Sequence, residues 1–141
     1  MNSWRDTASD EAQQTLDDLF DTALQLAVQH VAKRGGFLPF AVSAADGDPI
    51  SIEMLGEKAD ALRMIDLLWG SLRERRDDIA AAAVVADVRL GGDGWPDGIQ
   101  VEAEHRDGIV LSIVAPYRRR RLRRDVELGE FGLAEGQRRL W

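Results

Sequence analysis

Residues 99–114 read IQVEAEHRDGIVLSIV, and this stretch decides the fold. Apolar and polar residues alternate from Ile99 to Glu104, as they do in a strand with one buried face. Asp107-Gly108 is the pair that most favours a type I′ hairpin turn, so a second strand, residues 109–117, is expected to return beside the first. Apolar side chains fall on both faces of that second strand, which indicates a central position. The stretch therefore predicts an antiparallel sheet.

Two helices are predicted upstream of this hairpin. From about Thr7 to Arg34 the apolar residues recur every three or four positions, and Gly35-Gly36 supplies a stop. A second stripe of this kind covers about residues 57–76. Gly70 within it indicates that another element packs closely there, because glycine weakens a helix interior.

The remaining predicted strands are residues 37–43, 50–54 and 79–90. Residues 46–49 between the first two are turn formers, and Ile52 and Met54 of the second strand are expected to point inward. The element order is α-β-β-α-β-β-β. We expect an α+β fold with a five-stranded antiparallel sheet in the spatial order 2-1-5-4-3. Both helices are expected to pack on one face of this sheet.

Composition narrows the class of protein. The chain has 141 residues, a net charge of −7 and no cysteine, which excludes a disulfide framework, a thiolate metal site and a cysteine nucleophile. Its polar beginning and the lack of a long apolar run predict a cytoplasmic protein that does not bind a membrane. The abundance of Ala, Arg, Asp and Gly is typical of a GC-rich bacterial genome. We expect a single α+β domain over residues 1–117, followed by a basic tail over residues 118–141 that packs on the domain or on a partner.

Three carboxylates are the candidate chemical centre. If Leu90 lies opposite Ile99, then Asp87, Glu102 and Glu104 line one face of the sheet. Such a cluster could bind a divalent cation or hold one carboxylate protonated as a general acid. The alternative, which we favour, is a charged sheet face neutralised by arginines. His30 and His105 each lack a second ligand at metal-binding spacing, so no metal and no cofactor are expected.

The basic run is the second candidate site. Residues 118–141 carry 8 Lys and Arg against 4 Asp and Glu, whereas residues 1–117 carry 10 against 21. One interpretation is that the run binds an anionic partner; the other, which we favour, is that it neutralises the acidic body. Nucleic acid is an improbable partner for so acidic a body. The candidate residues are Arg118, Arg119, Arg120, Arg121, Arg123 and Arg124.

An apolar patch on the sheet predicts self-association. With both helices on one face, the side chains of the other face would be uncovered, and large apolar patches on soluble proteins usually mark an interface. The predicted interface residues are Val85, Ile109, Leu111 and Ile113. We therefore expect a homodimer, in which residues 126–141 help to cover the patch or exchange between subunits.

The segments FLPFAV at 37–42, DGIQVEAEHRDG at 97–108 and APYR at 115–118 resemble those of a family of small bacterial proteins without an assigned activity. That resemblance implies no functional residue. The element order is similar to that of roadblock-type modules, which dimerise and act as scaffolds, although a third helix is not evident. The small size and acidity are more distantly similar to those of secretion chaperones.

Motifs for a nucleophile, a phosphate or a metal are absent from the sequence. The sequence therefore favours a non-enzymatic interaction or regulatory module, scaffold-like or chaperone-like, with an unknown protein partner. The alternative is a metal-dependent or hydrolase-like enzyme that uses Asp87, Glu102 and Glu104.

Overall fold

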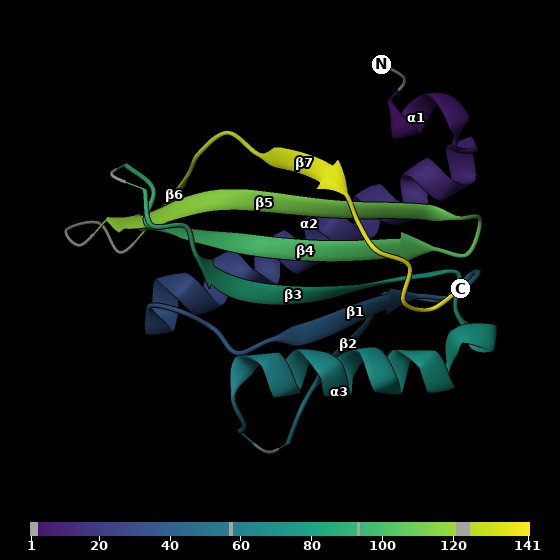
Figure 1. Ribbon diagram of the computed structural model, residues 1–141, viewed down its shortest axis with the longest axis horizontal. Coiled ribbons are helices and arrows are strands. Elements are labelled where there is room, and N and C mark those ends of the chain that lie inside the picture. Colours follow the sequence, from purple (N-terminus) through teal and green to yellow (C-terminus); the bar gives the residue numbers. More distant parts are fainter. Residues whose placement is uncertain (1–2, 57, 93, 121–124) are drawn as a thin grey trace.

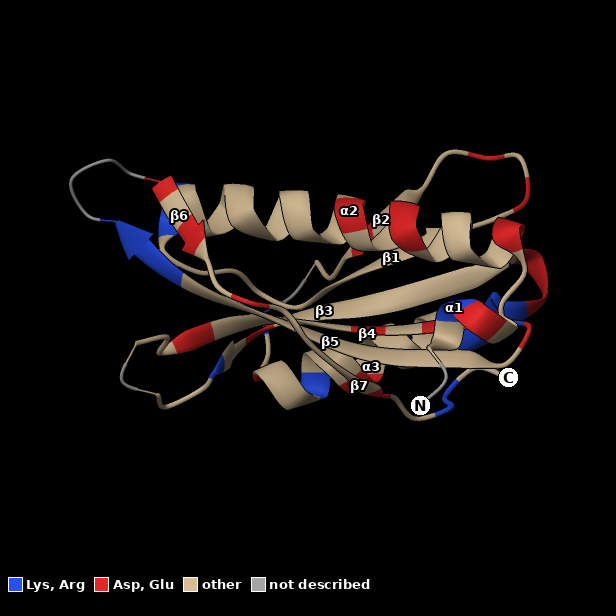
Figure 2. Ribbon diagram, turned by 90° about the horizontal axis from the view of Figure 1, so that it is seen from above, with Lys and Arg blue, Asp and Glu red and all other residues tan. Residues whose placement is uncertain are grey.

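The structure, a computed structural model, describes residues 3–56, 58–92, 94–120 and 125–141. It confirms the α+β class: a curled antiparallel sheet has α2 on one face and α3 on the other (Figures 1 and 2). The helices are α1 (Trp4–Thr7), α2 (Asp10–Arg34), α3 (Ala61–Glu74) and the short 3-10 helix η1 (Arg76–Asp78). The strands are β1 (Phe40–Ala44), β2 (Ser51–Met54), β3 (Ala81–Arg89), β4 (Asp97–His105), β5 (Ile109–Arg120), β6 (Asp125–Leu128) and β7 (Gly132–Glu135).

The helix α2 begins and ends at the residues that local chemistry favours. The Ser9 hydroxyl caps it by accepting a hydrogen bond from the Ala12 amide, and Gly35 ends it in the left-handed conformation with φ of 84°. Its apolar stripe is buried against β1, β3 and β4. The predicted helix is confirmed from Asp10 to Arg34, but Thr7, where it was expected to begin, is the last residue of the separate turn α1.

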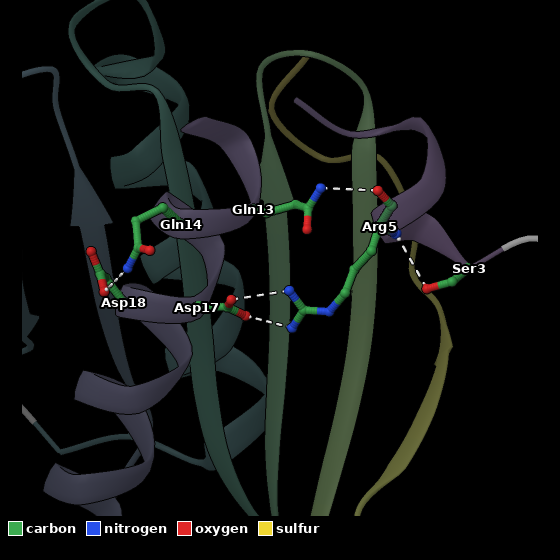
Figure 3. Close-up of polar contacts among 6 residues, drawn as sticks. All are labelled: Ser3, Arg5, Gln13, Gln14, Asp17 and Asp18. Atoms are coloured by element: carbon green, nitrogen blue, oxygen red, sulfur yellow. Dashed lines mark hydrogen bonds and ion pairs between the residues drawn. The ribbon is translucent and has the colours of Figure 1, made fainter. Parts of the chain in front are cut away.

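Polar contacts attach α1 to α2 (Figure 3). Arg5 donates two hydrogen bonds to the Asp17 carboxylate, at 3.0 and 2.7 Å, and the Gln13 side chain donates to the carbonyl of Arg5 at 2.9 Å. Because the Arg5–Asp17 pair is exposed, it orients α1 more than it stabilises the fold.

The helix α3 packs on the face of the sheet opposite α2. Its buried residues Leu68, Trp69 and Leu72 contact Ala82 and Val84 of β3, whereas the neighbouring Ala83 and Val85 face α2. The prediction that both helices share one face was therefore wrong. The reason is that β1 and most of β3 are buried on both faces, so each face needs its own cover.

Strand order and register also differ from the prediction. The order is β2-β1-β3-β4-β5-β6, with β7 also paired to β5, so β1 lies beside β3 and not beside β5. Asp87, not Leu90, lies opposite Ile99. Because this is an odd shift of three positions, it turns each side chain of β3 to the other face relative to β4.

The hairpin between β4 and β5 is confirmed, but its turn is not the predicted type. His105 pairs with Ile109, which leaves three residues in the loop. The Gly108 amide donates to the His105 carbonyl at 2.9 Å, and Gly108 has φ of 96°. This geometry is that of a three-residue hairpin loop with glycine at the left-handed position.

The chain beyond Tyr117 contributes to the sheet. The strand β5 continues to Arg120, β6 pairs with its end, and β7 pairs with residues 111–114 of its middle. The final residues then cross β5 and β4 towards α3, where Leu140 enters the core on the α3 face (Figure 1). None of the helices in the described part of the chain is both long enough and apolar enough to cross a membrane.

Candidate functional site

The predicted carboxylate cluster does not form. Glu102 and Glu104 lie on the α3 face of β4, whereas Asp87 shares the α2 face with its partner Ile99. The odd register shift separates them, since it moves Asp87 through the sheet. Within the residues that the structure describes, no group of three acidic or histidine side chains is placed to hold a metal ion.

Asp87 is instead part of a hydrogen-bonded connection between β3, β5 and the loop after α2. The Tyr117 hydroxyl donates to one carboxylate oxygen at 2.6 Å, and the Phe37 amide donates to the other at 3.3 Å. Burial raises the pKa of the Asp87 carboxyl, although both hydrogen bonds act in the opposite direction. Burial and the hydrogen bond to Asp87 raise the pKa of the Tyr117 hydroxyl. This arrangement positions the loop at residues 35–39.

Glu104 is the most buried carboxylate of the site residues, with 1% of its surface exposed. It accepts hydrogen bonds from the backbone amides of Arg139, Leu140 and Trp141, at 2.7, 2.9 and 3.0 Å. Glu102, two residues away, accepts from Ser112 at 3.0 Å and from Gln100 at 3.2 Å. Both carboxylates are therefore acceptors within the fold.

The described arginines of the basic run contact the protein itself. Arg118 donates to both carboxylate oxygens of Glu127 and lies over the Trp95 ring, with 4.4 Å to the ring centroid. Arg120 shares Glu127, and Arg119 donates to the Ala32 carbonyl at the end of α2. These hydrogen bonds lower the pKa of Glu127 to about 2. Arg121, Arg123 and Arg124 lie outside the described residues.

The residues predicted to form an exposed interface lie on the covered face. Val85 is fully buried and Leu111 is 6% exposed, while Ile109 and Ile113 are half-buried against the same core cluster. The helix α2 covers this cluster, so the premise of an uncovered apolar patch was wrong. Val85 and Leu111 are core residues of the chain itself, and Ile109 and Ile113 lie at the margin of that core.

His105 lies opposite Ala81 and is 4% exposed. Its Nδ1 accepts the Asp107 amide at 3.0 Å, and burial lowers the pKa of its imidazole. It therefore acts as a hydrogen-bond acceptor in the hairpin loop. His30 has a different position, because it lines an apolar pocket beside α2.

That pocket lies where α2, β2 and α3 meet, and its volume is about 450 Å³. The loop at residues 35–39 forms one wall, Met54 and Leu55 at the end of β2 form another, and the buried Met64 of α3 closes it. Phe37 and Phe40 pack edge to face within the wall, with 5.7 Å between ring centroids. His30 and Arg34 provide its polar lining. Its size and apolar character are those of a ligand-binding pocket.

Apolar side chains continue from the pocket onto the surface. Leu38, Ile52 and Met54 are 50%, 49% and 52% exposed. Ile52 and Met54 were predicted to point inward, but the apolar core of the α2 face does not extend over β2. Among the strands that the structure describes, β2 pairs only with β1, so its outer edge is free. We call this surface the β2 pocket: residues 34–40, 52–55, His30 and Met64.

Sequence reasoning missed the β2 pocket because its residues come from four separate segments. The one available signal was the short strand at residues 50–54, whose apolar residues continue directly into Leu55. Periodicity indicated correctly that Ile52 and Met54 share a face. It could not show that this face extends beyond the helix that covers its neighbours.

The Asp87–Tyr117 pair and the β2 pocket together give a positioned loop beside an apolar cavity. Comparison with family models, with curated proteins and with solved structures finds no match, so no match supports the resemblances noted in the sequence.

Proposed function

We propose that this protein is a non-enzymatic interaction module that binds an extended apolar segment of a partner protein along β2. The single observation that carries the proposal is the position of the pocket at the end of a free sheet edge. Peptides that add a strand to such an edge gain affinity from main-chain hydrogen bonds and specificity from side-chain pockets. Met54 belongs to both the strand and the pocket.

The chemistry of the pocket indicates the side chain that it would accept. Two methionines and two phenylalanines line it, and methionine adapts to ligands of varied shape. A large apolar residue is therefore the expected anchor. Arg34 at the pocket favours an acidic residue next to that anchor, because the guanidinium can pair with a carboxylate.

Selection of displayed peptides on the full chain, followed by calorimetry, tests the proposal. We expect selected peptides to carry a large apolar anchor and to bind at least about tenfold more weakly to Met54→Lys, because the charge would face the apolar pocket. Leu133→Lys is the matched control. Leu133 is 58% exposed on the outer strand β7, at the opposite side of the sheet, so its substitution should leave binding unchanged.

A second measurement distinguishes strand addition from simple pocket filling. Methylation of alternate peptide nitrogens removes main-chain donors, so one of the two methylated sets should abolish binding while the anchor is retained. Failure to select any peptide, or binding that survives Met54→Lys, would contradict the proposal.

A further inference from the structure

The tail, residues 136–141, occupies a groove between α3 and β4. We call this the tail groove: Glu104 of β4 with Trp69, Arg73 and Arg76 of the α3 side. Leu140 is 1% exposed and packs against Leu68, Leu72 and Ile79 on the α3 face. The tail is therefore firmly packed in the groove.

The tail groove recognises mainly the backbone of the tail. Glu104 accepts three consecutive amides, and the carbonyls of Arg139 and Leu140 accept from Arg73 at 2.9 Å and from Arg76 at 3.2 Å. Arg139 also lies over the Trp69 ring, 5.2 Å from the centroid. A carboxylate that accepts consecutive backbone amides forms strong charge-assisted hydrogen bonds. The side chain of Leu140 fills the apolar part, and the partly buried Trp141 packs against the same cluster.

The arm that leads to the tail is held far more weakly. Residues 130–135 are all exposed, and Phe131 makes one edge-to-face contact with Phe20 at 5.7 Å. The strand β7 within this arm pairs with β5 over four residues. A firmly seated anchor at the end of a lightly packed arm is the arrangement from which segments exchange between copies.

We propose that the tail groove is a peptide-binding site whose second occupant is the tail of another copy of this chain. Because recognition uses the backbone and Leu140, every contact made within one chain can be remade between two chains. Reciprocal exchange would close a two-fold homodimer in which each copy contributes a residue, Leu140, to the core of the other. This proposal is independent of the β2 pocket.

Within one chain the tail competes with any second copy at an effective concentration on the order of millimolar. The full chain should therefore be monomeric when dilute and should form a dimer only when its concentration approaches that range. A pair of full-length variants removes the competition between a chain's own tail and the tail of a second copy for the groove. Leu140→Asp leaves the tail groove intact but vacant, and Glu104→Ala leaves the tail intact but removes its acceptor.

Light scattering on the two variants tests the proposal directly. Each variant alone should be monomeric, and the equimolar mixture should form a 1:1 heterodimer at a concentration at least about tenfold lower than the full chain needs. In the control mixture Leu133→Asp replaces Leu140→Asp. Its tail still fills its own groove, so no heterodimer is expected.

The absence of a heterodimer from two variants that are folded by circular dichroism would overturn the proposal. If either variant fails to fold, the milder pair Leu140→Ala and Glu104→Gln gives the same comparison. A capped peptide of residues 135–141 titrated into Leu140→Ala provides a second readout. We expect saturable binding to Leu140→Ala and binding about tenfold weaker to the double variant that also carries Glu104→Gln. Equal binding to both would also overturn the proposal.

Discussion

At the residue scale, Asp87 shows how one hydrogen bond reduces the cost of a partly buried charge. The folded protein holds the Asp87 proton more tightly than the unfolded chain, because its pKa is raised above the ordinary value of 3.8. Ionisation of Asp87 therefore lowers stability as the pH rises through that value towards neutrality. The Tyr117 hydroxyl reduces this loss, since it donates to the ionised carboxylate at 2.6 Å.

We predict that Tyr117→Phe destabilises the protein by about 1–3 kcal/mol at neutral pH, because it removes the shorter of the two hydrogen bonds that the ionised Asp87 accepts. The loss should be smaller below the ordinary pKa of Asp87, where the carboxyl is protonated in both states. Urea unfolding at the two pH values measures this difference. An equal loss at both would contradict the role assigned to the hydroxyl.

Glu127 has the opposite pH dependence. Its pKa is lowered from 4.5 to about 2 by the hydrogen bonds from Arg118 and Arg120. A lowered pKa contributes stability that is present above 4.5 and is lost as the pH falls towards 2. We predict that Glu127→Gln is less stable than the unmodified chain above this range, and that the difference disappears as the pH falls through it.

The midpoint of urea unfolding, measured across this pH range and at two salt concentrations, checks that prediction. Added salt should reduce the difference, because the pair is accessible to solvent. Glu130→Gln is the control: Glu130 is exposed and makes no ion pair with any described residue. A difference independent of pH would mean that Glu127 acts through packing and not through its charge.

At the scale of the elements, a glycine inside α3 and a glycine at the end of α2 have different roles. Gly70 was expected to mark a close approach, but no described atom outside the adjacent residues and backbone of α3 lies within 4 Å of the position that its Cβ would take. Gly35 ends α2 with φ of 84°, and a Cβ there would lie 3.1 Å from the Arg119 guanidinium. Of these two glycines, only Gly35 is required by the conformation of the backbone.

We predict that Gly70→Ala stabilises the protein by about 0.5–1 kcal/mol, because alanine has the higher helix propensity and meets no neighbour. Gly35→Ala should destabilise it by about 1–2 kcal/mol through the left-handed backbone. Urea unfolding of the two variants checks both signs. Destabilisation by Gly70→Ala would contradict the prediction, because it would mean that the added methyl group meets a neighbour.

At the scale of the whole molecule, both faces of the central strands are covered. Val84 is 3% exposed on the α3 face and Val85 is fully buried on the α2 face. Neighbouring residues thus belong to two separate core clusters. A sheet with only one covered face would bury only one of them.

We predict that Val84→Ala and Val85→Ala each lower the free energy of unfolding by about 1–3 kcal/mol, because each removes buried methyl groups. Neither change should alter the oligomeric state, since both side chains lie inside the chain. Chemical unfolding and light scattering measure the two quantities. Leu133→Ala, on the exposed β7, should change stability little. If only one of the two valines mattered, the two-sided arrangement would be wrong.

The sequence by itself determined the local elements, because their signals lie within a few residues of one another. Ser9 and Gly35 fix the ends of α2 through their own backbone preferences. Pro39 cannot donate to a strand pair, and β1 begins at Phe40, directly after it. Alternation and the Asp107-Gly108 pair located β4, β5 and the hairpin between them. These features require no knowledge of distant residues.

Only the tertiary structure decided which side chains meet. Residues 79–86 read IAAAAVVA, apolar at every position, so the hydrophobic pattern allows more than one register against β4. The register that the fold adopts separates Asp87 from Glu102 and Glu104. The β2 pocket and the tail groove likewise combine segments far apart in the chain, and Glu104 lies 35 positions from the nearest amide that it accepts. Long-range packing determines which side chains meet, because the local sequence is compatible with more than one register.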